Sequence, residues 1–170
     1  MSPKNIDKLN CSIASALDII GEGWTILILR EAFFGSRRFE DFQKHLGIAR
    51  NILTVRLNKL CDSGVLVRVP IKVGAKRNEY RLTPMGSDLA VILIGLTQWG
   101  DRWLNPTQGA PVTFIERATG KAVADIAIFT RDGKKLKPRE LAVKPGPGAT
   151  AETIARLKLI PDVRRKKKKN

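Results

Sequence analysis

Apolar residues recur at helical spacing through the first third of the chain. A first helix, opening at Asn10 or Ser12, is predicted from residues spaced i, i+4, i+7: Ile13, Leu17 and Ile20. From about Trp24 to Phe34 the sequence is apolar nearly all round. Such a pattern predicts a buried central helix.

Two shorter amphipathic helices are predicted next, joined at Gly47-Ile48. The inward positions of the first are Phe39, Phe42 and Leu46, and those of the second are Leu53, Leu57 and Leu60. At about 100° per residue, the outer side of the second helix carries a polar set: Asn51, Thr54, Val55 and Asn58, with Arg50 at its edge. A helix–turn–helix needs a second helix of this kind, buried on one side and polar on the side that enters a DNA groove.

The segment that follows has the pattern of a β-hairpin and a last helix. Gly64 is expected to end the preceding helix, and an apolar run over 65–69, a turn at 74–77 and a returning run over 79–83 predict a wing. Thr83-Pro84 has the pattern of an N-cap with proline at the first helical position, which predicts one helix to about Leu104. The predicted fold is mainly α with a small β wing (α+β), a winged helix–turn–helix.

Asn105-Pro106 is expected to end this first domain, residues 1–104. Residues 105–148 are predicted to form a small β-rich appendage, with short strands over 112–117, 124–129 and 140–143. A short helical segment is expected over 149–163. The basic tail 164–170 is expected to be disordered.

Several sequence words in the first domain closely resemble the HxlR family of bacterial winged helix–turn–helix transcriptional regulators. In order, they are Cys11, IGEGWTILILRE (20–31), GSRRF (35–39), LTVRL (53–57), DSGVLVR (62–68) and NEYRLTPMG (78–86). The resemblance covers residues 11–104 and is specific, because several motifs occur in the same order along the chain. It departs at Ala49, where the family usually places a serine that can cap the recognition helix.

Double-stranded DNA is therefore the expected partner. On the recognition helix, Asn side chains can pair with adenine, Arg50 can fork onto guanine, and Thr54 and Val55 can meet thymine methyls. Contacts with the DNA backbone are expected from Arg37 and Arg38, which precede the first motif helix. Lys76 and Arg77 at the wing tip can reach either phosphates or a narrow minor groove. Arg56 lies at the margin of the buried face, where it either pairs with Glu31 or contacts a phosphate.

The last predicted helix carries more apolar surface than a domain of this size can bury alone, although packing across the wing accounts for part of it. The resemblance implies dimerisation through the first and last helices. The predicted dimer interface is Ile13, Leu17, Leu89, Ile92, Leu93, Leu96, Trp99 and Trp103. A dimer would place two recognition helices about one DNA turn apart, so a pseudo-palindromic operator is expected.

Cys11 is the candidate sensor. It lies at the start of the first helix, where exposed amides favour a thiolate, and some family members use a cysteine here to sense oxidants or electrophiles. The alternative is a small buried apolar residue. Cys61, near the buried side of the recognition helix, is interpreted as structural.

The chain of 170 residues carries a net charge of +15, unevenly spread. Residues 105–170 hold 16 Lys/Arg against 6 Asp/Glu, and six of these cations form the run 164–169. This balance favours a polyanionic partner, because each neutralised phosphate releases counterions. The alternative is a solvated tail that keeps the protein soluble.

Catalysis finds little support in the sequence. The one histidine, His45, is expected to be a surface residue or a phosphate contact, and no catalytic triad or phosphate loop is identifiable. With two distant cysteines, no metal site or cofactor is predicted, and the protein is not expected to be an enzyme. No apolar run approaches the roughly 18 residues that span a bilayer, and no signal segment opens the chain, so no membrane association and a cytoplasmic location are expected.

Two functions follow from these patterns. The first is a homodimeric, sequence-specific transcriptional regulator, most simply a repressor, whose effector is an electrophile at Cys11 or a small molecule near the dimer interface. The second is an architectural or non-specific nucleic-acid-binding protein, driven by the basic tail.

Overall fold

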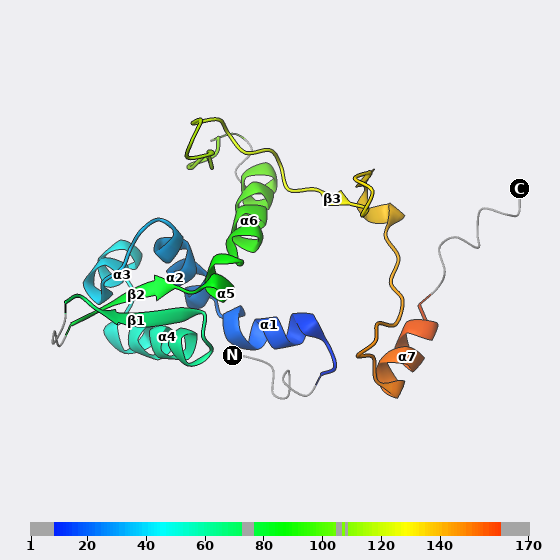
Figure 1. Ribbon diagram of the computed structural model, residues 1–170, viewed down its shortest axis with the longest axis horizontal. Helices are drawn as coiled ribbons and strands as arrows, with labels where there is room; N and C mark the ends of the chain where they lie inside the picture. Colours follow the sequence, from blue (N-terminus) through cyan, green and yellow to red (C-terminus); the bar gives the residue numbers. More distant parts are fainter. Residues whose placement is uncertain (1–8, 73–76, 105–106, 108, 161–170) are drawn as a thin grey trace, which may run out of the picture.

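The protein is mainly helical with a small antiparallel sheet, as predicted. The computed structural model describes residues 9–72, 77–104, 107 and 109–160. Figure 1 shows the first four helices and the hairpin gathered into one body, from which a long helix projects. These elements are α1 (Ser12–Ile20), α2 (Gly23–Phe33), α3 (Phe39–Leu46), α4 (Arg50–Asp62), β1 (Leu66–Pro70), β2 (Asn78–Leu82), α5 (Pro84–Ser87) and α6 (Ala90–Trp103).

The core is built around α2, which packs against α1, α3, α4, α6 and β2. Its apolar composition on every side makes this central position favourable, and Ile28, Leu29 and Ala32 are fully buried. Phe42 of α3 and the inward leucines of α4 (Leu53, Leu57 and Leu60) are also fully buried. Each such side chain contributes about 1.5–3 kcal/mol through burial, so this cluster fixes the helix–turn–helix on α2.

The wing is anchored to the loop that precedes α3. β1 and β2 pair antiparallel, from Leu66 opposite Leu82 to Pro70 opposite Asn78. The backbone N–H of Tyr80 donates to the carbonyl of Arg37 at 2.7 Å, so this loop lies along β2. The Tyr80 ring also packs edge-on against Phe42, with ring centroids 6.2 Å apart. The wing is therefore attached to α3 as well as to α4.

The single helix expected from Pro84 to Leu104 is in fact two helices. The predicted N-cap is confirmed, since Thr83 Oγ1 accepts the N–H of Gly86 at 3.1 Å. Gly86 lies so close to the wing that a Cβ there would stand 2.2 Å from the carbonyl oxygen of Val65. An i→i+3 bond from Leu89 N–H to the Gly86 carbonyl then tightens the chain, and α6 starts in a new direction. The break lets α5 pack against β2, with Gly86 beside Val65, while α6 packs on α2.

The appendage contains much less strand than predicted. Its described residues form β3 (Ile128–Phe129) paired with β4 (Lys135–Leu136), and one isolated bridge between Ile115 and Ala122. The strand expected over 140–143 is wrong, because a 3₁₀ turn (Pro138–Glu140) and irregular backbone occupy this region. None of the described residues from 107 to 160 is buried. A two-layer β-structure would need a buried face, and this segment has none.

The C-terminal helix α7 (Ala151–Lys158) lies within the segment 149–163 where a short helix was expected, and it is held at the start of α1 (Figure 1). Asn10 makes the contact: its Nδ2 donates to the Gly148 carbonyl, and its Oδ1 accepts from Thr150 N–H and Thr153 Oγ1. α1 begins at Ser12, the second of the two predicted starts, with Cys11 as its N-cap, so Asn10 is not the residue that opens this helix.

The length and apolar composition of the helices bear on whether they could span a membrane. Within the described ranges, no single helix is long and apolar enough to cross a bilayer, and only the pair α1–α2, bent by 77°, reaches that length together.

Candidate nucleic-acid interface

The turn between α3 and α4 has the geometry that the sequence predicts. Gly47 ends α3 in the left-handed conformation with φ of +61°, where other residues are strained, and Ile48 turns inward to the core. The next helix then exposes the predicted polar set, Asn51, Thr54, Val55 and Asn58, on the side opposite its buried leucines. Val55 is 58% exposed, an unusual position for an aliphatic side chain unless a partner covers it.

The start of α4 is held by Arg50 in place of a side-chain cap. Ala49 is the N-cap and, as expected from its missing hydroxyl, makes no capping bond. The Arg50 guanidinium lies over the Phe39 ring, 4.9 Å from its centroid, which ties α4 to the start of α3. Thr54 Oγ1 donates back to the Arg50 carbonyl at 2.8 Å. The Thr54 hydroxyl thus donates within its own helix, so the methyl group is the part of this side chain available to a partner.

Asn58 belongs to a small cluster that the sequence did not predict. Its Oδ1 accepts a hydrogen bond from Arg68 of β1, and the Arg68 guanidinium lies 5.9 Å from the Tyr80 ring centroid. The bond to the Tyr80 side chain raises the pKa of Arg68 further, so this exposed group is cationic at all working pH values. Arg68 extends the positively charged surface from α4 onto the wing. The sequence feature that could have indicated this cluster was the position of Arg68 on the outward face of the strand.

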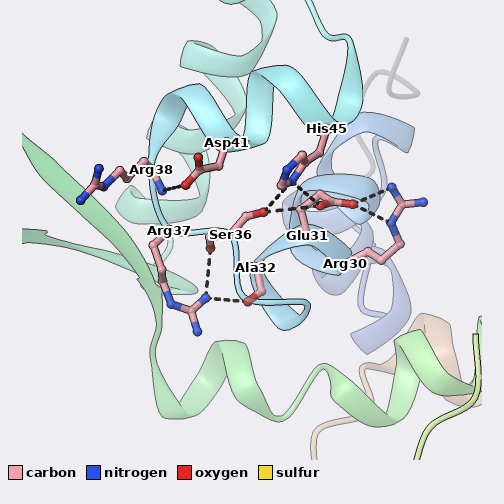
Figure 2. Close-up of polar contacts among 8 residues, drawn as sticks. All are labelled: Arg30, Glu31, Ala32, Ser36, Arg37, Arg38, Asp41 and His45. Atoms are coloured by element: carbon pink, nitrogen blue, oxygen red, sulfur yellow. Dashed lines mark hydrogen bonds and ion pairs between the residues drawn. The ribbon is translucent and has the colours of Figure 1, made fainter.

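The two arginines before α3 differ in their surroundings (Figure 2). Arg37 is half-buried, and its Nη1 donates to the carbonyls of Ala32 at 2.6 Å and Ser36 at 3.0 Å. Arg38 is exposed, and its backbone begins the helix: its N–H donates to Asp41 Oδ2 at 3.4 Å, and its carbonyl accepts the N–H groups of Asp41 and Phe42 at 3.1 and 3.2 Å. Arg37 therefore braces the loop, while the Arg38 side chain extends outward.

Of the two predicted wing-tip cations, Lys76 lies outside the described residues. Arg77 is exposed, and its carbonyl accepts the N–H of Ile71 at 3.2 Å where the hairpin opens.

A buried carboxylate joins α2 to α3 (Figure 2). Glu31 is 7% exposed, and its Oε1 accepts from Arg30 Nη2 at 2.8 Å. Its Oε2 lies 3.4 Å from Ser36 Oγ and 3.2 Å from His45 Nδ1. His45 thus contacts Glu31, as well as presenting a half-exposed ring at the end of α3. The signal for this cluster was a glutamate within an otherwise apolar helix, which has to find partners when buried.

The predicted pairing of Arg56 with Glu31 is wrong. Arg56 Nη2 instead lies 3.3 Å from Glu22 Oε2, at the N-cap of α2. Arg56 is on the α2 side of α4, and Glu31 is already satisfied by partners on the α3 side. The Arg56–Glu22 pair joins the recognition helix to the start of α2 and gives Arg56 a positioning role.

The two cysteines have opposite acid–base surroundings. At the N-cap of α1, the backbone N–H groups of Ala14 and Ile13 lower the pKa of the Cys11 thiol, and Arg156 of α7 adds to the effect. Burial raises the pKa of Cys61 on α4. Cys11 is therefore the more readily ionised thiol of the two, as its predicted position implied.

The predicted dimer face is largely exposed in the single chain. Exposed residues of α1 and α6 are Ile13 (70%), Leu17, Ile92, Leu96, Trp99 and Trp103 (66%). Leu93 differs, because it is 9% exposed and lies in the core of its own chain, and Leu89 packs partly against the same core. The apolar stripe of the last helix therefore has two sides, one used within the chain and one left uncovered.

A helix–turn–helix with an exposed polar face, flanked by a two-stranded wing, defines a winged helix–turn–helix DNA-binding protein. The HxlR-like helix-turn-helix family matches residues 19–108, more than half of the chain. The protein belongs to this family of bacterial transcriptional regulators, which are not enzymes.

Relatives extend the likeness beyond the family's domain. The uncharacterized HTH-type transcriptional regulator Rv3095 of Mycobacterium tuberculosis is 41% identical over 141 residues, which is 83% of this chain and 89% of the relative. The crystal structure of PA1607, a proposed transcription factor, is 38% identical with a TM-score of 0.76, and the match covers 82% of this chain and 98% of that one. Both matches are longer than residues 19–108, so part of the appendage is shared.

A third likeness is to the reduced form of the redox regulator HypR. It is 26% identical with a TM-score of 0.50, covering 57% of this chain and 99% of that one.

Proposed function

We propose that the protein is a homodimeric repressor that binds a pseudo-palindromic operator through α4. The observation that carries the proposal is the exposed face of α4, in which Asn51, Thr54 and Val55 stand opposite three fully buried leucines. The buried leucines fix the helix rigidly. The outward groups are the types that contact base edges and thymine methyls in a major groove.

The surrounding cations have the role of holding the duplex. Arg38 at the N-cap of α3, Arg68 on β1 and Arg77 next to the wing tip, directly before β2, are exposed. Such residues fix the register of the protein on the phosphates without reading sequence. Arg37 contributes mainly by bracing its loop, and Lys76 belongs to the same set by its position in the wing.

Dimerisation through α1 and α6 is supported by the uncovered apolar side of these helices. Ile13, Leu96, Trp99 and Trp103 are each at least half exposed, and a patch of this kind is a liability on an isolated chain. A two-fold pair would place two α4 helices about one DNA turn apart.

Cys11 is the proposed switch for oxidants or electrophiles. Its lowered thiol pKa and its partly exposed position make it the more reactive of the two cysteines, and the likeness to the redox regulator HypR supports the same reading. Modification would act at the start of α1, next to Asn10 and its contacts with α7.

The test is a fluorescence-anisotropy titration on DNA from upstream of the protein's own gene, with a scrambled duplex alongside, across a salt series. A regulator of this operator should prefer the native fragment by at least about 10³-fold. Equal, steeply salt-dependent binding to both fragments would contradict specific binding to it.

The competing function is an architectural protein driven by the basic run 164–169, which lies outside the described residues. Removing residues 161–170 distinguishes the two. The truncated regulator should keep its preference for the operator, whereas the architectural protein should lose most of its binding.

A further inference from the structure

An apolar cavity lies beside the helix–turn–helix, between α2, α6 and the appendage. Its volume is about 640 Å³, within the range of small-molecule sites. Phe33 of α2 and Phe34 directly after it line the cavity, together with Ile94 and Leu96 from α6 and Val112 and Ile115 from the appendage. Aromatic and aliphatic side chains therefore make up most of the lining.

Among the lining residues that the structure describes, one side chain is charged. Arg30 of α2 contributes to the wall, and the only other polar side chains among the described lining residues are those of Thr97 and Thr113. Thr97 Oγ1 is already bonded to the Leu93 carbonyl at 3.0 Å. A single guanidinium among aromatic and aliphatic groups is suited to a ligand with a large apolar body and one negative charge.

We propose that this cavity binds a small apolar anion, an aromatic or long-chain acid, whose acid group pairs with Arg30. Binding of this ligand does not depend on the proposed regulatory function. Only its role as an effector rests on that proposal. Arg30 directs Nε and Nη2 to one oxygen of Glu31, at 3.2 and 2.8 Å. A guanidinium has five N–H donors, so a ligand acid can share this group or compete for it.

The same pair links the cavity to the DNA-binding motif. Glu31 is held by Arg30 through one carboxylate oxygen, and through the other it contacts Ser36 and His45 of the α3 region (Figure 2). A ligand acid that draws Arg30 away would leave Glu31 with its α3 partners alone. The ligand and Glu31 therefore compete for one cation, and this competition predicts opposite effects of substituting the two residues.

The experiment compares two fluorescent probes with the same aromatic body. Anilinonaphthalene sulfonate carries one negative charge, and the neutral phenylnaphthylamine does not. Both are titrated against the full chain without DNA. We expect saturable binding of one sulfonate probe per chain, and tighter binding of this probe than of the neutral one.

Four variants then locate the site. Arg30→Met should weaken the sulfonate probe about tenfold and leave the neutral probe unchanged, since a charge-assisted hydrogen bond is lost while the cavity remains. Glu31→Gln should tighten the sulfonate probe, and Ala90→Phe, which fills the cavity, should weaken both probes. Arg139→Met, on an exposed arginine away from the cavity, controls for the change in net charge.

Three results would overturn the proposal. One is unchanged sulfonate binding in Arg30→Met, and another is unchanged binding of both probes in Ala90→Phe. The third is a wild type that binds neither probe saturably, combined with an Ala90→Phe variant that no longer dimerises. This pair of results would mean that a second copy of the chain occupies the cavity. Because no DNA is present, failure here is distinct from failure of the repressor proposal, which operator binding measures.

Discussion

His45 Nδ1 lies 3.2 Å from Glu31 Oε2, so a carboxylate buried on the central helix holds the first helix of the DNA-binding motif. The contact joins α3 to the core at the end opposite Arg38, and Ser36 Oγ lies 3.1 Å from the same histidine nitrogen. The helix–turn–helix is therefore positioned by a polar cluster as well as by apolar packing.

Replacing the Glu31 carboxylate should lower the free energy of unfolding. We expect Glu31→Ala to lower the free energy of unfolding by about 2 kcal/mol, because Ser36 and Arg30 lose a charged acceptor that is shielded from water. Urea denaturation followed by circular dichroism measures the change. Glu40→Ala, on an exposed residue of α3, should stay within about 0.5 kcal/mol and serves as the control. Equal effects of the two substitutions would refute a structural role for Glu31.

Two residues of α4 should separate stability from DNA binding. Leu57 is fully buried, so Leu57→Ala should cost about 2–5 kcal/mol of unfolding free energy. Val55→Ala, on the exposed side of the same helix, should leave stability within about 0.5 kcal/mol and weaken operator binding. Thermal unfolding and anisotropy on the same preparations check both. If Val55→Ala kept full operator affinity, Val55 would have no place in the interface.

The two thiols should ionise in different pH ranges. The pKa of Cys11 is lowered by amides of the first turn of α1, so its reactive thiolate should already form at a pH below the ordinary range. The pKa of Cys61 is raised by burial, so its thiolate should form only at higher pH. Iodoacetamide labelling across a pH series, with Cys61→Ser to isolate Cys11 and Cys11→Ser to isolate Cys61, measures each midpoint. Coincident midpoints, or a higher one for Cys11, would argue against the sensor proposal.

The exposed tryptophans of α6 should hold the dimer together. Trp99 and Trp103 are 56% and 66% exposed, so replacing both with glutamate should leave the fold intact and shift the protein from dimer to monomer. Sedimentation velocity with circular dichroism reports both properties. Met85→Glu introduces one such carboxylate at an exposed apolar residue of α5 and should leave the dimer unchanged. A double variant that remained dimeric would place the interface elsewhere.

The fold could be predicted wherever a residue pattern was compatible with a single local structure. Leucines at helical spacing gave α4 its buried side, and Thr83-Pro84 gave α5 its start, because burial and capping act over a few neighbouring residues. The break before α6 could not be predicted from the sequence. It depends on the close approach of Gly86 to Val65, which are 21 positions apart in the chain.

Pairings between distant charged residues were the least predictable part of the site. Arg56 has two candidate partners, Glu31 on α2 and Glu22 at its N-cap. The sequence does not show how α4 is rotated against α2, and this rotation brings Arg56 to Glu22. The bond between Asn58 and Arg68 likewise depends on how β1 leaves the helix. In the appendage, short alternating runs predicted strands, but strands need partners, and the described segment buries no residue against which a sheet could form.

Whether α4 reads bases is tested by selecting bound sites from a random duplex pool with the wild type and with Asn51→Ala. We expect a pseudo-palindrome with half-sites about 10 base pairs apart, and for Asn51→Ala the same motif with a relaxed preference at one position in each half. An unstructured pool from the wild type, or an identical motif from both proteins, would contradict base reading by α4.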